Sequence, residues 1–528
     1  MQIVDIAFDR VIPFSSRDIQ YQLSVEKFGD FIAFEPSIEG LIDAIEERKK
    51  HPVDRKVLYD VLQCNYSDTT TSLQAEYIEQ VSNERTFTIT TAHQPVIFGG
   101  PAFYIYKIAS VIHLSTTLRL RFPEYNFVPV FVNGGEDHDF DEVKKTFLFQ
   151  NEIQWDTDQK GAVGRFNTEG LQAILQEFSA ILGNSDTAQN ISDMLKESLE
   201  VARDYNDFVF HWLNKLFGKY GLLVLNMDDP KLKHNFIPIF KKEIEDMPSQ
   251  DIIKHTQDDL GELGFKPQAY AREVNIFYLS DGARDRIVYQ DGNYMIGDSI
   301  YTKHEIFEIL NKSPENFSPN VILRPLYQEF SLPDIAFIGG GGEIAYWIER
   351  KKQFAYFGVY FPTIIRRNSF LIVPKTLQKT IQNLHLNVDD LFMTEHVVVS
   401  KYLDIASKHA LDFSEEEKQI LFSIDAIAAK AYHIDATLEP LVKSEGAKLM
   451  KNLSNVQHRI LKAAKQKEET ALQQIHNLYQ KLFPDGGLQE RRDNFFSFMA
   501  NSHKVDLLDY IIKNSNPLDK HFKVVLMD

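Results

Sequence analysis

The sequence of 528 residues has a single cysteine, Cys64, so no disulfide can form within the chain and a reducing compartment suits it. No run approaches the roughly 18 uninterrupted apolar residues of a membrane-spanning helix. The first ten residues lack the basic region and apolar stretch of a secretory signal. We therefore expect a cytoplasmic protein, in which Cys64 is a small buried residue of a helix rather than a nucleophile.

The sequence has fewer basic than acidic residues: 57 lysines and arginines against 75 aspartates and glutamates give a net charge of −18. A field of that sign repels nucleic-acid phosphates and anionic lipid, so we expect no nucleic acid and no membrane as partners. An anionic small substrate would need a local basic pocket. With 44% apolar residues the chain can bury a large core. At roughly 150 residues per domain, its length corresponds to three or four units, or to one core with insertions.

Two segments have the strand, loop, helix and strand order of a parallel βαβ unit. In the first, the β-branched run TFTITT (86–91) precedes a glycine loop, a helix and the apolar run FVPVFVNGG (127–135). In the second, a strand at 335–338 precedes four glycines, a helix and a strand at 361–367. The sequence therefore predicts an α/β protein built on a parallel sheet. The segment before residue 86 is predicted to be mostly helical.

A long helical region is predicted from about residue 415. Apolar residues recur at alternating steps of four and three from Ile420 to Leu438, and again from Leu449 to Ala463, with Pro440 and Gly446 between the two runs. Sustained spacing of this kind predicts an antiparallel helical hairpin or coiled coil. The alternative is a pair of ordinary surface helices packed on the core.

The loop AHQPVIFGGP (92–101) follows the first core strand and opens a helix. It places His93 and Gln94 at the strand end, where open α/β sheets bind their ligands. Backbone N–H groups near Gly99 and Gly100 could hold an anion. The loop matches neither the dinucleotide-binding nor the P-loop fingerprint. A tight structural turn is about as good an interpretation of this loop as a binding site.

The segment GGEDHDFDE (134–142) follows the second strand and concentrates titratable groups directly after two glycines. Its acids could bind a substrate amine or hold a divalent ion with a nucleotide phosphate, and His138 could serve in acid–base chemistry. The alternative is a solvated acidic helix start that exploits the helix dipole. Zinc is not expected, because Cys64 is distant in sequence and no H-E-x-x-H motif occurs.

Two later motifs add positive charge and glycine. Arg324, in RPLYQE, could bind a carboxylate or phosphate, or form only a surface ion pair. The turn GGGGE (339–343) lets a ligand approach the backbone closely, and four consecutive glycines are more than a structural turn usually needs. The run RRNS (366–369) ends the next strand and supplies two arginines.

Four blocks of this sequence together resemble one known family. HQPVIFGGPAFYIYKI, VPVFVNGGEDHDFDEV, LRPLYQEFSLPDIAFIGGGGEIAYW and PTIIRRNSF are similar to blocks of the cysteine-adding enzymes of bacillithiol biosynthesis, the BshC family of cysteine ligases. The resemblance covers essentially the whole chain. It implies a Rossmann-like core and a coiled coil that pairs two subunits into a homodimer. It also implies that cysteine is joined to glucosaminyl-malate through an amide, with ATP suspected as the activator of the carboxyl group and any need for a metal open.

With that resemblance, the chain divides into six predicted parts. These are an N-terminal helical segment (1–85), the first half of the Rossmann-like core (86–149), a connecting insertion (150–320), the second half of the core (321–410), an antiparallel coiled coil (411–484) and a C-terminal return to the core (485–528).

Residue roles are assigned from charge, with no residue assigned to a metal. The catalytic candidates are Glu136, Asp137, His138 and His93, and the substrate-binding candidates are Gln94, Asp139, Tyr104, Lys107, Arg324, Glu343, Trp347, Arg367, Asn368 and Ser369. The nucleotide- or anion-binding candidates are Gly99, Gly100, Gly339, Gly340, Gly341 and Gly342.

Two other functions remain open at this stage. One is a nucleotidyltransferase or other nucleotide-binding enzyme on the same core, although the His-x-Gly-His and Lys-Met-Ser-Lys-Ser signatures are absent from the sequence. The other is a non-catalytic scaffold whose coiled coil recruits partners. Charges clustered at separate strand ends favour an enzyme over a scaffold.

Overall fold

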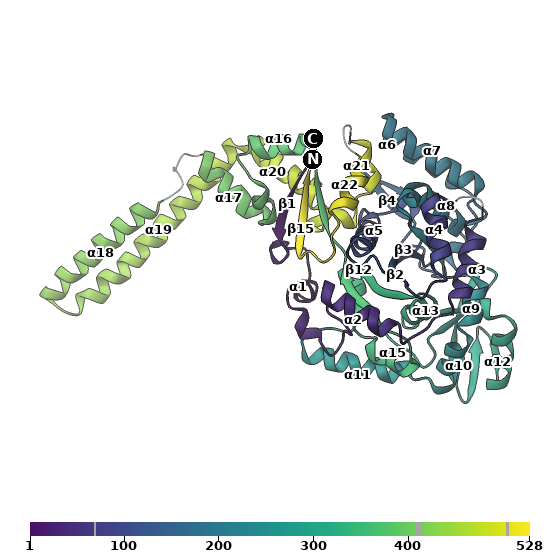
Figure 1. Ribbon diagram of the computed structural model, residues 1–528. Coiled ribbons are helices and arrows are strands. Elements are labelled where there is room, and N and C mark those ends of the chain that lie inside the picture. Colours follow the sequence, from purple (N-terminus) through teal and green to yellow (C-terminus); the bar gives the residue numbers. More distant parts are fainter. Residues whose placement is uncertain (68–69, 407–412, 503–505) are drawn as a thin grey trace.

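The computed structural model in Figure 1 describes residues 1–67, 70–406, 413–502 and 506–528. Its centre is a parallel sheet of five strands in the order β13-β12-β2-β3-β6. The strands are β2 (Thr86–His93), β3 (Asn126–Asn133), β6 (Leu223–Asn226), β12 (Asp334–Gly339) and β13 (Thr363–Arg366). The fold is thus the α/β, Rossmann-like parallel-sheet core that the sequence predicts.

Both faces of this sheet are covered, which explains its apolar strands. Helices α2 (Ile38–Arg48) and α5 (Phe103–Arg121) pack on one face against residues such as Phe87 and Ile335. On the other face, Val130 and Phe337 belong to a second core cluster shared with α13 (Arg324–Ser331). Because both faces of the sheet are buried, its partly exposed residues, such as His93 and Asn226, lie at the strand ends.

The segment between β3 and β12 contains helices and a second sheet. Helices α6 (Leu171–Leu182), α7 (Asp186–Val201) and α8 (Tyr205–Phe217) share a core cluster with α5 and the C-terminal segment, and β6 joins the edge of the central sheet. An antiparallel sheet follows in the order β10-β9-β8-β7-β11. Its strands are β7 (Ile276–Ser280), β8 (Ala283–Gln290), β9 (Asn293–Ile296), β10 (Ser299–Tyr301) and β11 (Phe317–Pro319).

The two ends of the chain meet in a third sheet. Strand β1 (Gln2–Ala7) pairs antiparallel with β15 (His521–Leu526), which pairs in parallel with β14 (Phe370–Val373). The prediction of a mostly helical start missed β1, because the strand with which it pairs, β15, lies at the far end of the chain. The helices α1 (Ser16–Leu23), α3 (Arg55–Asn65) and α4 (Ser72–Gln80) do follow in this segment, together with α2.

Cys64 is exposed, so the expectation that it is buried was wrong. Helix α3 turns Leu58, Val61 and Leu62 toward the core, and Cys64 lies on the opposite face. The prediction that Cys64 lies in a helix was correct, but the prediction that this residue is buried was not.

An antiparallel helical arm projects from the body (Figure 1). It consists of α18 (Ser414–Ile434) and α19 (Leu438–Lys467), and α20 (Glu469–Leu482) leads the chain back. Helix α19 runs through Pro440, which lies in its first turn where proline is tolerated, and through Gly446. A Cβ at Gly446 would come within 2.6 Å of the Ile424 side chain, so glycine allows the two helices to pack closely. The predicted boundary at 410/411 lies outside the described residues.

In the described part of the chain, none of the helices combines the length and the apolar character that crossing a membrane requires.

Candidate functional site

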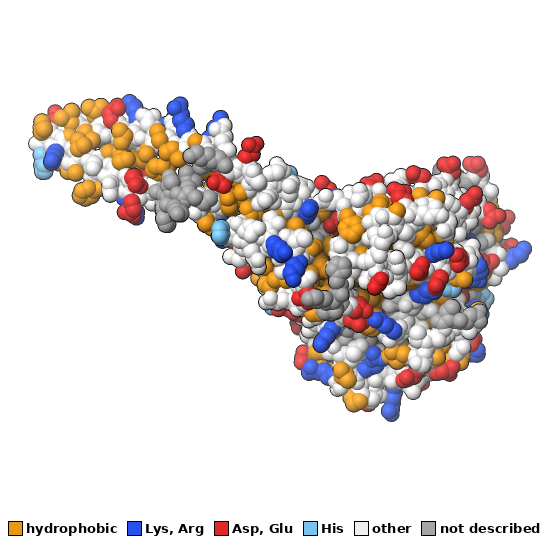
Figure 2. Space-filling model, turned by 90° about the horizontal axis from the view of Figure 1, so that it is seen from above, with side chains coloured by type: hydrophobic (Ala, Val, Ile, Leu, Met, Phe, Trp, Pro, Cys, Tyr) orange, Lys and Arg blue, Asp and Glu red, His pale blue; other side chains and the backbone are white. Residues whose placement is uncertain are grey.

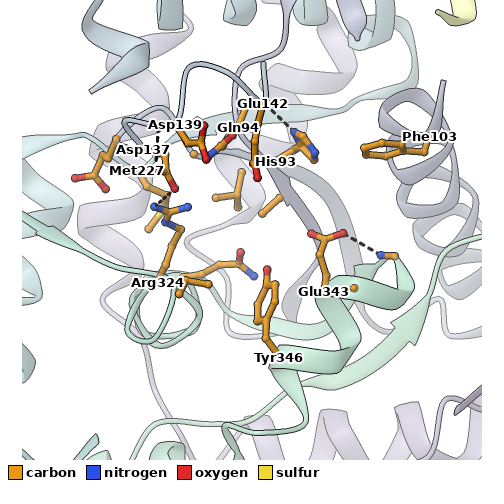
Figure 3. Close-up of a pocket in the computed structure, with 18 of the residues that line it drawn as sticks. His93, Gln94, Phe103, Asp137, Asp139, Glu142, Met227, Arg324, Glu343 and Tyr346 are labelled. Atoms are coloured by element: carbon orange, nitrogen blue, oxygen red, sulfur yellow. Dashed lines mark hydrogen bonds and ion pairs between the residues drawn. The ribbon is translucent and has the colours of Figure 1, made fainter. Parts of the chain in front are cut away.

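A cavity of about 1050 Å³ opens at the carboxyl ends of the central strands (Figure 3). In the sheet, β2 lies between β3, which is the next core strand in sequence, and β12, which belongs to the second half of the core. The strand order therefore reverses beside β2, and the cavity lies at this point, where open α/β sheets bind ligands. Asp137 and Gly340, from opposite halves of the core, line this same cavity. The predicted site residues in its lining are His93, Gln94, Glu136, Asp137, His138, Asp139, Arg324, Gly340, Gly341, Gly342, Glu343 and Arg367.

One wall of the cavity is built around Asp137. Arg324, at the start of α13, donates to its Oδ2 at 3.0 Å, and Arg284 Nη1 lies 3.6 Å from its Oδ1. Burial alone would raise the pKa of Asp137, but the two guanidinium groups hold that pKa well below its usual range. Asp137 is therefore a permanent carboxylate that fixes both arginines.

Arg284 belongs to β8 of the insertion, and its side chain is almost fully buried. The guanidinium stacks over Phe277 at 4.0 Å and donates to His138 Nδ1 at 2.8 Å. The antiparallel sheet of the insertion thus places a residue beside the cavity at the carboxyl edge of the core sheet. Sequence reasoning missed Arg284, since nothing in its local pattern points to the cavity.

Glu136 is buried behind this wall in an ion-pair network. Lys233, on α9 (Pro230–Asn235), contacts Glu136 Oε1 at 2.5 Å and Asp228 Oδ1 at 2.8 Å. Arg165 in turn holds Asp228 through two hydrogen bonds. Burial raises the pKa of Glu136, and Lys233 opposes that effect. The network ties the loop after β3 to the loop after β6, and Lys233 is a second residue that sequence reasoning missed.

The opposite wall carries Arg367, at the end of β13. Its Nη2 donates to Glu490 at 2.8 Å, and the guanidinium lies 5.3 Å from the Phe103 ring centre. Its Nε is buried without a partner among the described residues. Arg491 also lines the cavity, and burial followed by repulsion from Arg367 lowers the pKa of Arg491. This wall has an excess of positive charge.

Lys107 and Glu343 form a pair beside that wall. The buried Lys107 Nζ donates to Ala92 O at 2.5 Å and contacts Glu343 Oε2 at 2.7 Å. Burial lowers the pKa of Lys107, and Glu343 acts in the opposite direction. Glu343 also accepts from the backbone N–H of Gly340 at 2.9 Å, so it caps its own helix α14 (Gly341–Trp347). Lys107 therefore positions Glu343 rather than lining the cavity itself.

Several other predicted residues lie outside the cavity lining. Tyr104 is buried under the His93 ring at 5.3 Å, and Trp347 stacks on Phe337 at 4.4 Å. Gly99 and Gly100 have positive φ values of 80° and 50° and form a turn whose hypothetical Cβ atoms would face Phe496 and Val96. The remaining three are Gly339 within β12, and Asn368 and Ser369, which are buried around Arg367 and Glu490.

Further lining residues come from helix faces that the sequence motifs already contain. Gln328 lies one turn after Arg324 on α13, and Tyr346 lies one turn after Glu343 on α14. Helical spacing from the predicted residues would have found both. Met227, after β6, also lines the cavity, and no local motif marks it. Within the described ranges, no group of three His, Cys, Asp or Glu side chains is arranged to hold a metal ion.

Comparison with known proteins agrees with this architecture. Residues 2–368 match the family model described as "Bacillithiol biosynthesis BshC, N-terminal Rossmann-like domain", and residues 370–527 match "Bacillithiol biosynthesis BshC, C-terminal coiled-coil domain". The chain is 36% identical to the "Putative cysteine ligase BshC" of Flavobacterium psychrophilum and 33% identical to that of Christiangramia forsetii, in each case over 98% of both chains. The chain therefore belongs to the BshC family of bacillithiol biosynthesis.

Proposed function

We propose that the protein is a ligase that joins the carboxyl group of cysteine to the amine of glucosaminyl-malate. The observation that carries this proposal is one cavity with a carboxylate-rich wall and a guanidinium-rich wall. Glucosaminyl-malate has a cationic amine at one end and a dicarboxylate at the other. Opposite walls of opposite charge would bind such a molecule in one orientation.

The acidic wall contains two carboxyl groups besides Asp137 that can bind an ammonium group. Asp139 and Glu142 line the cavity beside Asp137 (Figure 3). Burial, and then repulsion from Asp139 and Asp137, raises the pKa of Glu142. A substrate ammonium would relieve that repulsion. Asp137 is not available for this role, because it is already paired with Arg324 and Arg284. We assign the amine of glucosaminyl-malate to Asp139 and Glu142.

The basic wall has the corresponding excess of cations for carboxylate or phosphate oxygens. Arg491 has no side-chain hydrogen bond or ion pair to the rest of the described chain, and the Arg367 Nε is free. The backbone at Gly342 is open, because a Cβ there would meet nothing within 4 Å, whereas a Cβ at Gly341 would lie 2.5 Å from the Asp18 carboxyl group. These groups would bind malate or a nucleotide phosphate.

Activation of the carboxyl group is part of the proposal, because a carboxylate is a poor electrophile. ATP, when bound, would supply an acyl-phosphate or an acyl-adenylate. Release of orthophosphate or of pyrophosphate would separate these two routes. The chain's own residues would orient the reactants and exclude water from the cavity.

The helical arm supports a homodimer. Phe422 and Ile434 on the arm are 77% and 83% exposed, and Ile427 and Leu449 are also largely exposed. Figure 2 shows apolar side chains gathered along the arm and fewer of them on the body. Isolated exposed apolar residues are ordinary, but a continuous row along a helical hairpin favours a partner helix. We propose that a second copy of the chain covers this row, and that the protein works in the reducing cytosol that its single cysteine suits.

Purified protein incubated with cysteine, ATP and glucosaminyl-malate should yield bacillithiol, measured by mass spectrometry. The variants Asp139→Asn and Glu142→Gln should each raise KM for glucosaminyl-malate about tenfold, which corresponds to about 1.4 kcal/mol. Glu46→Gln, on helix α2 and outside the cavity lining, is the matched control and should leave KM unchanged. Absence of product with saturating substrates, or a deletion strain with a normal bacillithiol content, would contradict the proposal.

A further inference from the structure

Two histidines line the cavity at the ends of the adjacent strands β2 and β3, and they contact chemically opposite partners. His93 Nδ1 lies 2.9 Å from the carbonyl oxygen of Gln94. A carbonyl oxygen can only accept a hydrogen bond, so this nitrogen carries the proton. In the neutral ring, the Nε2 of His93 is then an unprotonated acceptor, and it makes no hydrogen bond within the described ranges.

His138 is in the reverse situation. Its Nδ1 lies 2.8 Å from Arg284 Nη1, and a guanidinium can only donate. Nδ1 must therefore be the acceptor, and the ring proton lies on Nε2. Asp137 Oδ1 is 3.6 Å from the same nitrogen, beyond hydrogen-bond reach. The hydrogen bond from Arg284 therefore specifies the tautomer of His138 that carries its proton on Nε2.

Arg284 is held rigidly enough to impose this arrangement. It is clamped between Phe277, the Ser318 hydroxyl at 3.4 Å and the Pro319 carbonyl at 3.3 Å. Its side chain is only 2% exposed, which leaves no room for it to turn away from His138. Burial, and then repulsion from Arg324, lowers the pKa of Arg284 to about 10, so its guanidinium is still charged at neutral pH and acts as a donor there.

We infer that the two histidines hold opposite tautomers, with His93 as the proton acceptor of the reaction, His138 as a neutral hydrogen-bond donor, and Arg284 as the positioning residue that sets His138. The inference rests on the proposed ligase function. It assigns His138, which sequence analysis considered for acid–base chemistry, to substrate orientation instead.

The proposed step balances with an acyl-phosphoric anhydride as the activated form of cysteine. The bound ammonium first releases one proton to solvent. The neutral amine nitrogen then attacks the acyl carbon, a C–N bond forms, and the acyl C–O bond breaks with its electron pair leaving on the phosphate oxygen. The second proton, which the nitrogen loses as the amide forms, passes to His93 Nε2. His138 Nε2–H donates to a substrate oxygen and keeps its proton throughout.

The surroundings of His93 keep it available as an acceptor. Burial, and then the positive charge of Lys107, lowers the pKa of His93 to about 4, while Glu343 opposes the shift and Arg367 adds to it. His93 is therefore unprotonated at neutral pH. A bound anion beside Arg367 would offset part of the positive charge and bring the pKa back toward its ordinary value, which makes the ring a better base.

The tautomers can be measured without any substrate. In full-length protein labelled with ¹⁵N-histidine, long-range ¹H–¹⁵N spectra distinguish protonated from unprotonated ring nitrogens, and the His93→Gln and His138→Gln variants assign the two rings. We expect a protonated Nδ1 on His93 and a protonated Nε2 on His138. His113, whose Nδ1 lies 3.0 Å from the Ile512 carbonyl, serves as an internal reference with the His93 pattern. The same tautomer on His93 and His138 would overturn the inference.

Arg284→Met should release His138 into a mixture of tautomers and leave the signals of His93 unchanged. Arg284→Lys, which keeps a donor, should restore most of the wild-type His138 signal. Arg10→Met, at an exposed ion pair with Asp389, is the control and should change neither ring. An unaltered His138 signal in Arg284→Met would remove Arg284 from its assigned role.

One substitution made at both histidines separates their roles in turnover. Glutamine retains an N–H donor but cannot accept a proton as a base. His93→Gln should lower kcat about 100-fold or more with little change in KM, the scale of general-base catalysis. His138→Gln should stay within about tenfold of wild type, while His138→Phe should lose far more. Equal losses from both glutamine variants would contradict the assignment. A wild-type protein without ligase activity would reject the proposed function, and the spectra would still decide the tautomers.

Discussion

Asp137 and Arg324 lie 187 positions apart in the sequence, yet a hydrogen bond of 3.0 Å joins Arg324 Nη2 to Asp137 Oδ2 at the wall of the cavity. The contact links the loop after β3 to the start of α13, so it joins the two halves of the core at one wall of the cavity. Its removal would affect the orientation of the acidic wall more than the rest of the fold.

Replacement of Arg324 by glutamine should lower kcat/KM about ten- to a hundredfold, because a charge-assisted hydrogen bond is worth about 1.5–3 kcal/mol. Arg324→Lys should recover only part of the loss, since an ammonium cannot reproduce the planar fork of the guanidinium. Steady-state kinetics with glucosaminyl-malate would measure both. Full activity of Arg324→Gln would show that Arg284 alone holds Asp137.

The Glu136–Lys233 pair should be strongly coupled in stability. Lys233→Met leaves the buried Glu136 without its ion-pair partner and should destabilise the protein by about 3–5 kcal/mol, as expected when one partner of a buried pair is lost. The double variant Glu136→Gln, Lys233→Met should be closer to wild type than Lys233→Met alone. Thermal unfolding of the four proteins of this cycle would measure the coupling. Simple addition of the single effects would contradict the network.

A buried carboxyl pair predicts an unusual pH dependence of stability. Asp334 is fully buried, and burial raises its pKa to about 7, although hydrogen bonds from Thr90, Glu329 and Thr88 oppose the shift. Burial also raises the pKa of Glu329 well above its ordinary value. The folded protein thus keeps protons that the unfolded chain releases near pH 4, so this pair makes stability fall as pH rises from about 4 to 7.

The double variant Asp334→Asn, Glu329→Gln should remove that contribution. Its thermal midpoint, relative to wild type, should therefore rise between pH 5 and pH 7. Glu46→Gln, at an exposed surface pair with Lys49, is the control and should give a constant difference over this range. A difference for the double variant that is independent of pH would show that the carboxyl pair is ionised in the folded protein.

The arm should control the oligomeric state. Phe422→Glu together with Ile434→Lys places charges in the exposed apolar row, and we expect a dimer to become a monomer in sedimentation velocity. Lys418→Gln, at an exposed ion pair on the same helix, should leave the dimer intact. An unchanged far-ultraviolet spectrum would show that the arm still folds. Wild-type protein that sediments as a monomer would reject the proposed pairing.

The parallel core could be predicted from the sequence because its signals are local. Apolar runs ending in glycine mark β3 and β12, and both predicted loops do line the cavity. Gly99 and Gly100 show the limit of such signals, since a glycine pair that serves a tight turn looks the same in sequence as one that approaches a ligand. The sequence leaves these two uses undecided.

The residues that sequence reasoning missed depend on tertiary contacts. Arg284 reaches His138 across 146 positions, and Lys233 reaches Glu136 from a short helix with no motif. Neither periodicity nor residue spacing predicts these two contacts, because they depend on how the insertion packs on the core. Helical spacing was sufficient for Gln328, which lies one turn from Arg324. The charge pattern predicts the walls of the site, and the packing determines which charges are already satisfied.

The pairing of β1 with β15 has a consequence for biosynthesis of the protein. Gln2 lies opposite Leu526, and β15 stands between β1 and β14 in their sheet. During translation, β1 and β14 therefore remain without β15 as a partner until almost the entire polypeptide has left the ribosome. A chain that is truncated before residue 521 would expose the unpaired backbone edges of both β1 and β14. Such incomplete chains should therefore aggregate or be degraded more readily than the complete one.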